Sequence, residues 1–113
     1  MNETKNHADN AFVFIETITP VEGHLDDVLA ISLRSAKLLE GRNGLIQSMV
    51  AKSEKKGSEI TAISVWSSKS DFQNFMKSED VAILLKSDDM KNIKSYMSNY
   101  DMLMSDLVEG WHG

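Results

Sequence analysis

Two side chains, Glu16 and Trp66, are the best candidates for chemistry in this sequence. Glu16 lies in the segment FVFIETIT, where it shares one side of an extended chain with Phe12 and Phe14. A carboxylate among apolar side chains can act as a general acid or base. Trp66 ends a later apolar segment, where its indole can form one wall of a cavity. Each has a structural alternative: a hydrogen-bonded or edge-exposed glutamate, and a tryptophan packed in the core.

Aromatic side chains elsewhere in the chain supply further walls for such a pocket. The candidate substrate-contacting residues are Phe14, Phe72, Phe75 and Tyr100. Each is also a common core residue by type, so core packing is the alternative for all of them. An apolar site with few polar groups favours a small apolar or aromatic ligand.

The sequence offers no conventional metal or cofactor site. It has no cysteine, and its three histidines, His7, His24 and His112, lack the spacing and nearby carboxylates of a metal site. It also lacks a GxGxxG or Walker-type phosphate loop and a GxSxG nucleophile elbow. We therefore predict no metal and no cofactor.

Length and charge limit the class of protein. The chain has 113 residues, enough for one domain, and its net charge of −5 disfavours a protein that coats nucleic acid. No apolar run approaches the roughly 20 residues of a membrane span, and the first ten residues lack the apolar core of a signal peptide. We expect a disordered polar tail over 1–11, a single domain over 12–113 and a cytoplasmic location, with no nucleic-acid or membrane partner.

Hydrophobic periodicity predicts the elements that position these side chains. In order, we expect a strand (12–19), a helix (24–41), a hairpin of two strands (44–53 and 59–67), a short helix (69–78) capped by Ser68 or Ser70, a broken helical stretch (79–97) and a last strand (100–109). The order β-α-β-β-α-β is typical of an α+β, ferredoxin-like fold. Such a fold has a four-stranded antiparallel sheet with its helices on one face.

Helices on one face leave the other face of the sheet to be covered. If Phe14 and Trp66 face the helices, the opposite face carries Val13, Ile15, Ile63 and Val65. That face is too apolar to leave in water on a small domain. We expect a homodimer in which two such sheets pack together, with cover by the C-terminal tail or further helices as the alternative.

Three segments resemble the antibiotic biosynthesis monooxygenase family, which consists of small dimeric α+β barrels. They are FVFIETITPVEGHLDDVL, EGRNGLIQSMV and, most of all, ISVWSSKSDFQNFMKSED, which is similar to the family's tryptophan-containing strand end and following helix. The closing LVEGWHG also resembles endings seen in the family. The resemblance spans roughly residues 12–112 and implies a dimeric α/β barrel.

The resemblance also bears on activity. Family members include cofactor-independent monooxygenases that oxidise aromatic polyketides to quinones, and haem-degrading enzymes. For the haem branch, the expected asparagine, tryptophan and histidine fall at Glu16, Phe75 and near Leu85, so that branch is disfavoured. For the quinone-forming branch, Trp66 matches a pocket tryptophan, whereas the expected asparagine is Ala62.

These observations leave three functional hypotheses. The first is a cofactor-independent monooxygenase acting on a small aromatic or quinol-like substrate, with Glu16 moving a proton and Trp66 forming a wall. The second is a non-catalytic dimer that binds a small molecule in the same cavity. The third is an isomerase or other proton-transfer enzyme.

Overall fold

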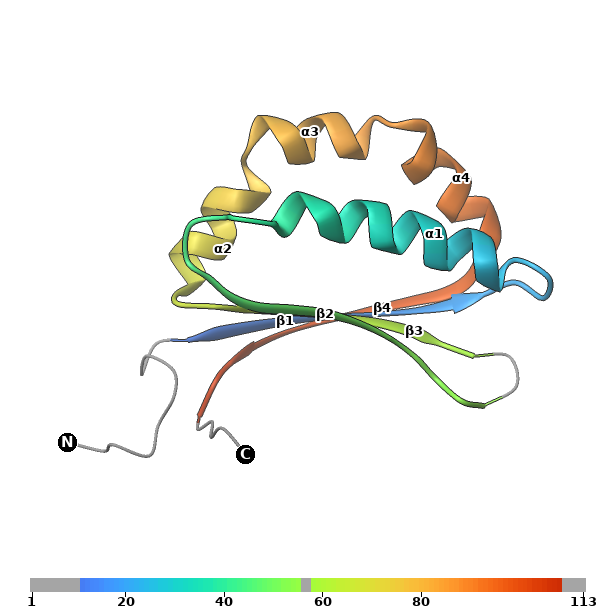
Figure 1. The fold of residues 1–113 in the computed structure, drawn as a ribbon, viewed down its shortest axis with the longest axis horizontal. Helices are drawn as coiled ribbons and strands as arrows, with labels where there is room; N and C mark the ends of the chain where they lie inside the picture. Colours follow the sequence, from blue (N-terminus) through green and yellow to red (C-terminus); the bar gives the residue numbers. More distant parts are fainter. Residues whose placement is uncertain (1–10, 56–57, 109–113) are drawn as a thin grey trace.

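The structure, a computed structural model, describes residues 11–55 and 58–108 (Figure 1). Its elements are β1 (Phe12–Pro20), α1 (Leu25–Ala36), a 3-10 turn η1 (Lys37–Leu39), β2 (Leu45–Lys52), β3 (Ile60–Trp66), α2 (Lys69–Met76), α3 (Glu79–Leu85), α4 (Asp88–Tyr96) and β4 (Met97–Asp106). The four strands form one antiparallel sheet in the order β2-β3-β1-β4. All the helices lie on one side of it (Figure 1). The predicted α+β, ferredoxin-like fold is confirmed.

Alternate residues of β1 face the helices, as the pattern of the segment predicts. Phe12 and Phe14 both contact Phe72 of α2, with ring centroids 5.1 and 4.8 Å apart. The register places Phe12 opposite Trp66 of β3 and Phe14 opposite Ser64. Because side chains alternate along a strand, Glu16 and Ile18 face the helices too.

The core between sheet and helices consists of two clusters at opposite ends of β1. One contains Phe12, Trp66 and Phe72. The other is built on the cross-strand pair Ile18 and Ile60 with isoleucines and a valine from α1 and α4: Val28, Ile31 and Ile93. Glu16 lies between the two clusters along β1, opposite the small side chain of Ala62.

Serine caps divide the second helical region into three short helices. The side chains of Ser68, Ser78 and Ser87 accept hydrogen bonds from backbone N–H groups of the first turns of α2, α3 and α4. A serine at the N-cap satisfies a donor that the helix leaves free. Of the two predicted caps of the short helix, Ser68 is the one observed.

Two arginines connect these helices to the rest of the helical layer. The Nε and Nη2 atoms of Arg34 on α1 each lie 2.9 Å from a carboxylate oxygen of Asp89 on α4. This hydrogen bonding lowers the pKa of Asp89 below its ordinary value. Arg42, in the loop after η1, pairs with Asp80 on α3. Two of the three short helices, α3 and α4, are thus held to α1 and the loop that follows it.

Gly44 occupies a backbone conformation that favours glycine. Its φ is +83°, and its carbonyl oxygen accepts a 2.7 Å hydrogen bond from the N–H of Ser67. The side chain of Asp71 fills the space where a Cβ at this position would lie. That carboxylate also accepts a 2.5 Å hydrogen bond from the Ser67 hydroxyl. The turn before β2 and the start of α2 therefore fit together only with glycine here.

Several predicted boundaries need correction. Ala11, assigned to the tail, is buried and its carbonyl accepts a hydrogen bond from the N–H of Leu107. The last strand begins at Met97 and ends at Asp106, because β1 continues to Pro20 and pairs with this earlier stretch. The predicted helix over 24–41 ends as a 3-10 turn at Leu39. Residues 1–10 of the predicted tail and the segment 109–113 lie outside the described residues.

The face of the sheet opposite the helices carries a continuous apolar row. The register aligns one residue from each strand across it, namely Met49, Ile63, Ile15 and Leu103. Val13 and Val65 form a neighbouring cross-strand pair on this face. Met49 and Leu103 are 41% and 56% exposed, so the row is open to solvent in the single chain. The predicted apolar outer face is confirmed in its residues.

Candidate functional site

A hydrogen-bonded pair, Glu16 and Tyr100, lies on the helix side of the sheet. The hydroxyl of Tyr100 on β4 donates to Oε2 of Glu16 on β1 over 2.5 Å. Tyr100 stands opposite Ile18, one alternate position from Glu16, so the two side chains meet diagonally across neighbouring strands. The pairing brings together two of the predicted site residues, 84 positions apart in sequence.

Tyr100 is held in its protonated form. Partial burial raises the pKa of the Tyr100 hydroxyl well above its ordinary value. The hydrogen bond that Tyr100 donates to Glu16 and the negative charge of Glu16 raise this pKa further. The phenol therefore keeps its proton at neutral pH and acts as a hydrogen-bond donor. Glu16 is half-buried, which leaves its carboxylate accessible to a bound molecule.

Apolar side chains surround this pair and remain partly open. Met102 and Met104 stand opposite Glu16 and Phe14 in the register, so both face the helices. They are nevertheless 53% and 49% exposed, and Tyr100 is 40% exposed. Apolar side chains with a few polar groups among them are the composition typical of ligand sites. Neither methionine is among the predicted site residues, although their alternation with Tyr100 along the strand is the signal that places them.

The predicted residue Trp66 lies in the core. Its side chain is fully buried, and its Nε1 donates a 2.9 Å hydrogen bond to the hydroxyl of Ser64. The indole packs against the rings of Phe72 and Phe75, with centroids 5.9 and 5.4 Å away. Phe72 is buried as well, whereas Phe75 is half-buried with the guanidinium of Arg42 5.2 Å from its ring centroid.

The predicted site residues therefore form two groups, which Phe14 connects. Trp66, Phe72 and Phe75 make one aromatic group, and Glu16 with Tyr100 makes the other. Phe14 joins them, because its ring contacts Phe72 and its position on β1 is next to that of Glu16 on the same face. Phe14 therefore lies between the Glu16–Tyr100 pair and the aromatic group.

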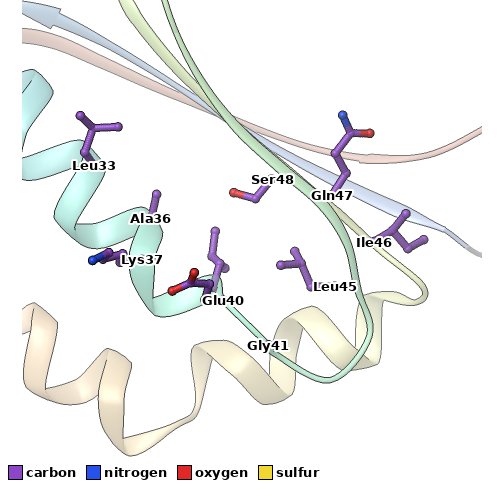
Figure 2. A pocket seen from close by; sticks show the side chains of 10 residues that line it. Leu33, Ala36, Lys37, Glu40, Gly41, Leu45, Ile46, Gln47 and Ser48 are labelled. Carbon is purple, nitrogen blue, oxygen red and sulfur yellow. The ribbon is translucent and has the colours of Figure 1, made fainter.

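A separate groove lies at the opposite edge of the sheet from β4, between the end of α1 and β2 (Figure 2). Its volume is about 450 Å³, and the side chain of Ser48 points into it from β2 whereas Gln47 points away. Apolar walls come from both elements, with Lys37 and Glu40 at the helix side. None of the predicted site residues is among the described residues that line it.

Two further features of the described residues concern metal ions and membranes. Within 11–55 and 58–108, no three histidine, aspartate or glutamate side chains gather as they would around a metal ion. No helix in this part of the chain is both long and apolar enough to cross a membrane.

Comparisons with known proteins complete the description of the site. The sequence profile of a family described as "Antibiotic biosynthesis monooxygenase" matches residues 11–83. A search of curated protein sequences gives no significant match.

Among solved structures, three similar ones illustrate the likeness in fold. SnoaB, a cofactor-independent oxygenase from Streptomyces nogalater, has a TM-score of 0.71 at 11% identity, covering 89% of this chain and 96% of its own. The protein SO0527 from Shewanella oneidensis has a TM-score of 0.75 at 10% identity, covering 90% and 95%. Rv0793 from Mycobacterium tuberculosis has a TM-score of 0.73 at 9% identity, covering 89% and 98%. At these identities the structures share a fold with this chain.

Proposed function

Because the chain belongs to the antibiotic biosynthesis monooxygenase family, we propose that it is a cofactor-independent monooxygenase acting on a small aromatic or quinol-like substrate. The observation that carries the proposal is the Glu16–Tyr100 pair beside an open apolar surface. The fold shared with SnoaB, itself a cofactor-independent oxygenase, supports the reaction type. Glu16 is the proposed proton acceptor, and the substrate lies against Phe14, Met102 and Met104.

In the proposed reaction the protein supplies position and proton transfer, and the substrate supplies the electrons. The carboxylate of Glu16 takes a proton from a hydroxyaromatic ring or its keto form, which leaves a delocalised anion. That anion reacts with O₂ at a ring carbon. One oxygen atom stays as a new carbonyl and the other leaves in water, so a CH₂ group becomes C=O with consumption of one O₂ and release of one H₂O. The substrate loses four electrons, and O₂ gains them.

The aromatic group has a positioning role in this proposal. Trp66 is enclosed, so it acts by fixing Phe72, which in turn supports Phe14 against the substrate. The hydrogen bond from the indole to Ser64 fixes the orientation of the tryptophan ring. A rigid aromatic wall beside a proton acceptor is what near-attack positioning requires.

The test is oxygen consumption with a panel of dihydroxyaromatic compounds and anthrone-type ketones. The wild-type protein should consume O₂ with at least one compound, and Glu16→Gln should be slower by about 10²- to 10⁴-fold, the usual contribution of a general base. Glu22→Gln, on the exposed turn after β1, is the matched control and should behave as wild type. No consumption above buffer with any compound would overturn the proposal.

A second candidate is a non-catalytic dimer that binds a small molecule at the same surface. The observation that favours it is the scarcity of polar groups, since Ala62 stands opposite Glu16 and offers no hydrogen bond to a substrate. Under this candidate, hydroxyaromatic compounds bind, as measured by calorimetry, without any oxygen consumption. The two measurements made together on one preparation separate the candidates.

We also propose that the functional unit is a homodimer formed through the outer face of the sheet. The supporting observation is the exposed apolar row that ends in Met49 and Leu103. Two sheets pack face to face about 10 Å apart, which would bury this row in both copies. Sedimentation of the wild type should give twice the 12.6 kDa of one chain.

A charged side chain introduced into the apolar row should break the dimer. Leu103→Asp should return the mass to 12.6 kDa at micromolar concentration, because the carboxylate would be buried without a partner. Ile83→Asp, on a similarly exposed side chain of α3, should leave the dimer intact. A wild-type mass of a single chain would contradict the dimer.

A further inference from the structure

Removing a proton from the substrate leaves a negative charge that the site must stabilise. The three strands around Glu16, namely β1, β3 and β4, contain no lysine, arginine or histidine. Glu16 itself is acidic, and Asp106 is a second acid on the helix side of β4, opposite Phe12. These three strands therefore bring no basic side chain to the site, and a neutral hydrogen-bond donor on them is the group that can stabilise the developing charge.

We infer that Tyr100 is this donor, and that its hydroxyl passes from Glu16 to the oxygen of the substrate as that oxygen loses its proton. This inference rests on the proposed function. In the unliganded site the Tyr100 hydroxyl donates to Oε2 of Glu16 over 2.5 Å. A substrate hydroxyl that gives its proton to the same carboxylate must lie within hydrogen-bond distance of it. The phenolic O–H of Tyr100 can then reach the substrate oxygen by turning about its C–O bond.

Proton transfer itself supplies the driving force for this exchange. Before transfer, the negative charge is on Glu16, and the hydroxyl donates to it. After transfer, Glu16 is a neutral acid and the substrate oxygen is the stronger acceptor, since hydrogen bonds to charged groups are stronger. Before transfer, partial burial and the charge of Glu16 raise the pKa of Tyr100, and after transfer the partial burial still favours the protonated phenol. One donor thus serves the charge in both positions.

The same charges define the class of substrate. With a neutral hydroxyaromatic molecule, Glu16 and the substrate together carry one negative charge before and after proton transfer. A substrate that carries a carboxylate or phosphate would place a second negative charge beside Glu16 with no basic side chain on the three surrounding strands. The site therefore selects uncharged phenols and quinols over their carboxylated analogues.

The test uses 4-nitrophenol as a probe, because the absorbance of a phenol of this kind changes when it ionises. Its ionisation when bound is titrated in the wild type, Tyr100→Phe and the control Tyr96→Phe, whose ring stacks on His24. Tyr100→Phe should lower the ionisation constant of the bound probe about tenfold or more, the effect of one hydrogen bond to a charged acceptor. Tyr96→Phe should leave it unchanged.

Three outcomes would overturn the inference. They are equal ionisation of the probe in Tyr100→Phe and wild type, no spectral change of the probe with any variant, and equal binding of 4-nitrophenol and 4-hydroxybenzoate. Circular dichroism checks that each variant is folded. Where oxygen consumption is present, Tyr100→Phe should lower kcat with little change in KM, because the hydrogen bond forms on the charged state. The probe titration stands without turnover, so a failure of the monooxygenase proposal remains distinguishable.

Discussion

Replacing Gly44 by alanine perturbs the joint between the turn before β2 and the start of α2. Two effects follow from the geometry. An alanine must adopt a φ of +83°, and its Cβ must displace the side chain of Asp71. Displacing Asp71 also breaks the 2.5 Å hydrogen bond that its carboxylate accepts from Ser67. Each effect can be given a magnitude.

The left-handed conformation costs an L residue about 1–2 kcal/mol. Stiffening of the unfolded chain by alanine returns about 0.4–1 kcal/mol, so the net backbone cost is roughly 1 kcal/mol. Loss of a hydrogen bond to a charged acceptor adds about 1.5–3 kcal/mol. We therefore expect Gly44→Ala to lower the free energy of unfolding by about 2–4 kcal/mol, a large share of the roughly 5–15 kcal/mol typical of a domain.

Urea denaturation followed by circular dichroism measures this change. With a slope of about 2 kcal/mol per M, the midpoint should fall by roughly 1–2 M. Gly23→Ala is the matched control. Gly23 has a similar φ of +87°, but nothing lies within 4 Å of the position of a Cβ. It should show the backbone cost alone, a midpoint shift of about 0.5 M.

A double substitution isolates the contact with Asp71. Asp71→Ala removes the displaced side chain, so adding Gly44→Ala to it should cost no more than Gly23→Ala does. Equal destabilisation by Gly44→Ala and Gly23→Ala in the wild-type background would refute the reasoning. It would mean that the Asp71 side chain moves aside without losing a stabilising interaction.

Two further predictions concern the aromatic group and the tyrosine of the site. Phe72→Ala should lower the free energy of unfolding by about 3–5 kcal/mol, because it leaves a cavity between Phe12, Phe14 and Trp66. A decrease below about 1 kcal/mol in urea denaturation would contradict this packing. The raised pKa of Tyr100 should make the free energy of unfolding fall as pH rises above about 10, because the unfolded tyrosine loses its proton there and the folded one does not. A urea midpoint that stays constant between pH 9 and 12 would contradict this prediction.

The fold could be predicted from the sequence because local patterns determine most of its elements. Alternation in FVFIETIT and EITAISVW indicates which side chains face the helices, and the register confirms that assignment at Phe12 and Trp66. The start of the last strand could not be predicted. Asn99 is a poor strand former by type, yet it pairs with Thr19, and this long-range partner determines the local structure.

Glu16, Phe14 and Tyr100 of the candidate site could be predicted from the sequence, whereas their grouping with Met102 and Met104 could not. The strand pattern places Glu16 beside Phe14, and both positions are confirmed. Its hydrogen bond to Tyr100 depends on the register of two strands far apart in sequence, which no local pattern contains. For Trp66 the sequence left a cavity wall and core packing open, and the structure shows the neighbouring rings of α2 enclosing it. Their assigned roles remain predictions.

The exposure of β4 on both faces has a consequence for the protein in concentrated solution. Met102, Leu103 and Met104 form an apolar run on an edge strand, the kind of segment that adds strands from other chains and aggregates. Asp101 and Asp106 flank this run on the same strand. Repulsion between like charges opposes the stacking of identical strands in register, so the two aspartates act as gatekeepers. The two aspartates thus oppose self-association at the same edge strand whose exposed methionines leave the site open to a ligand.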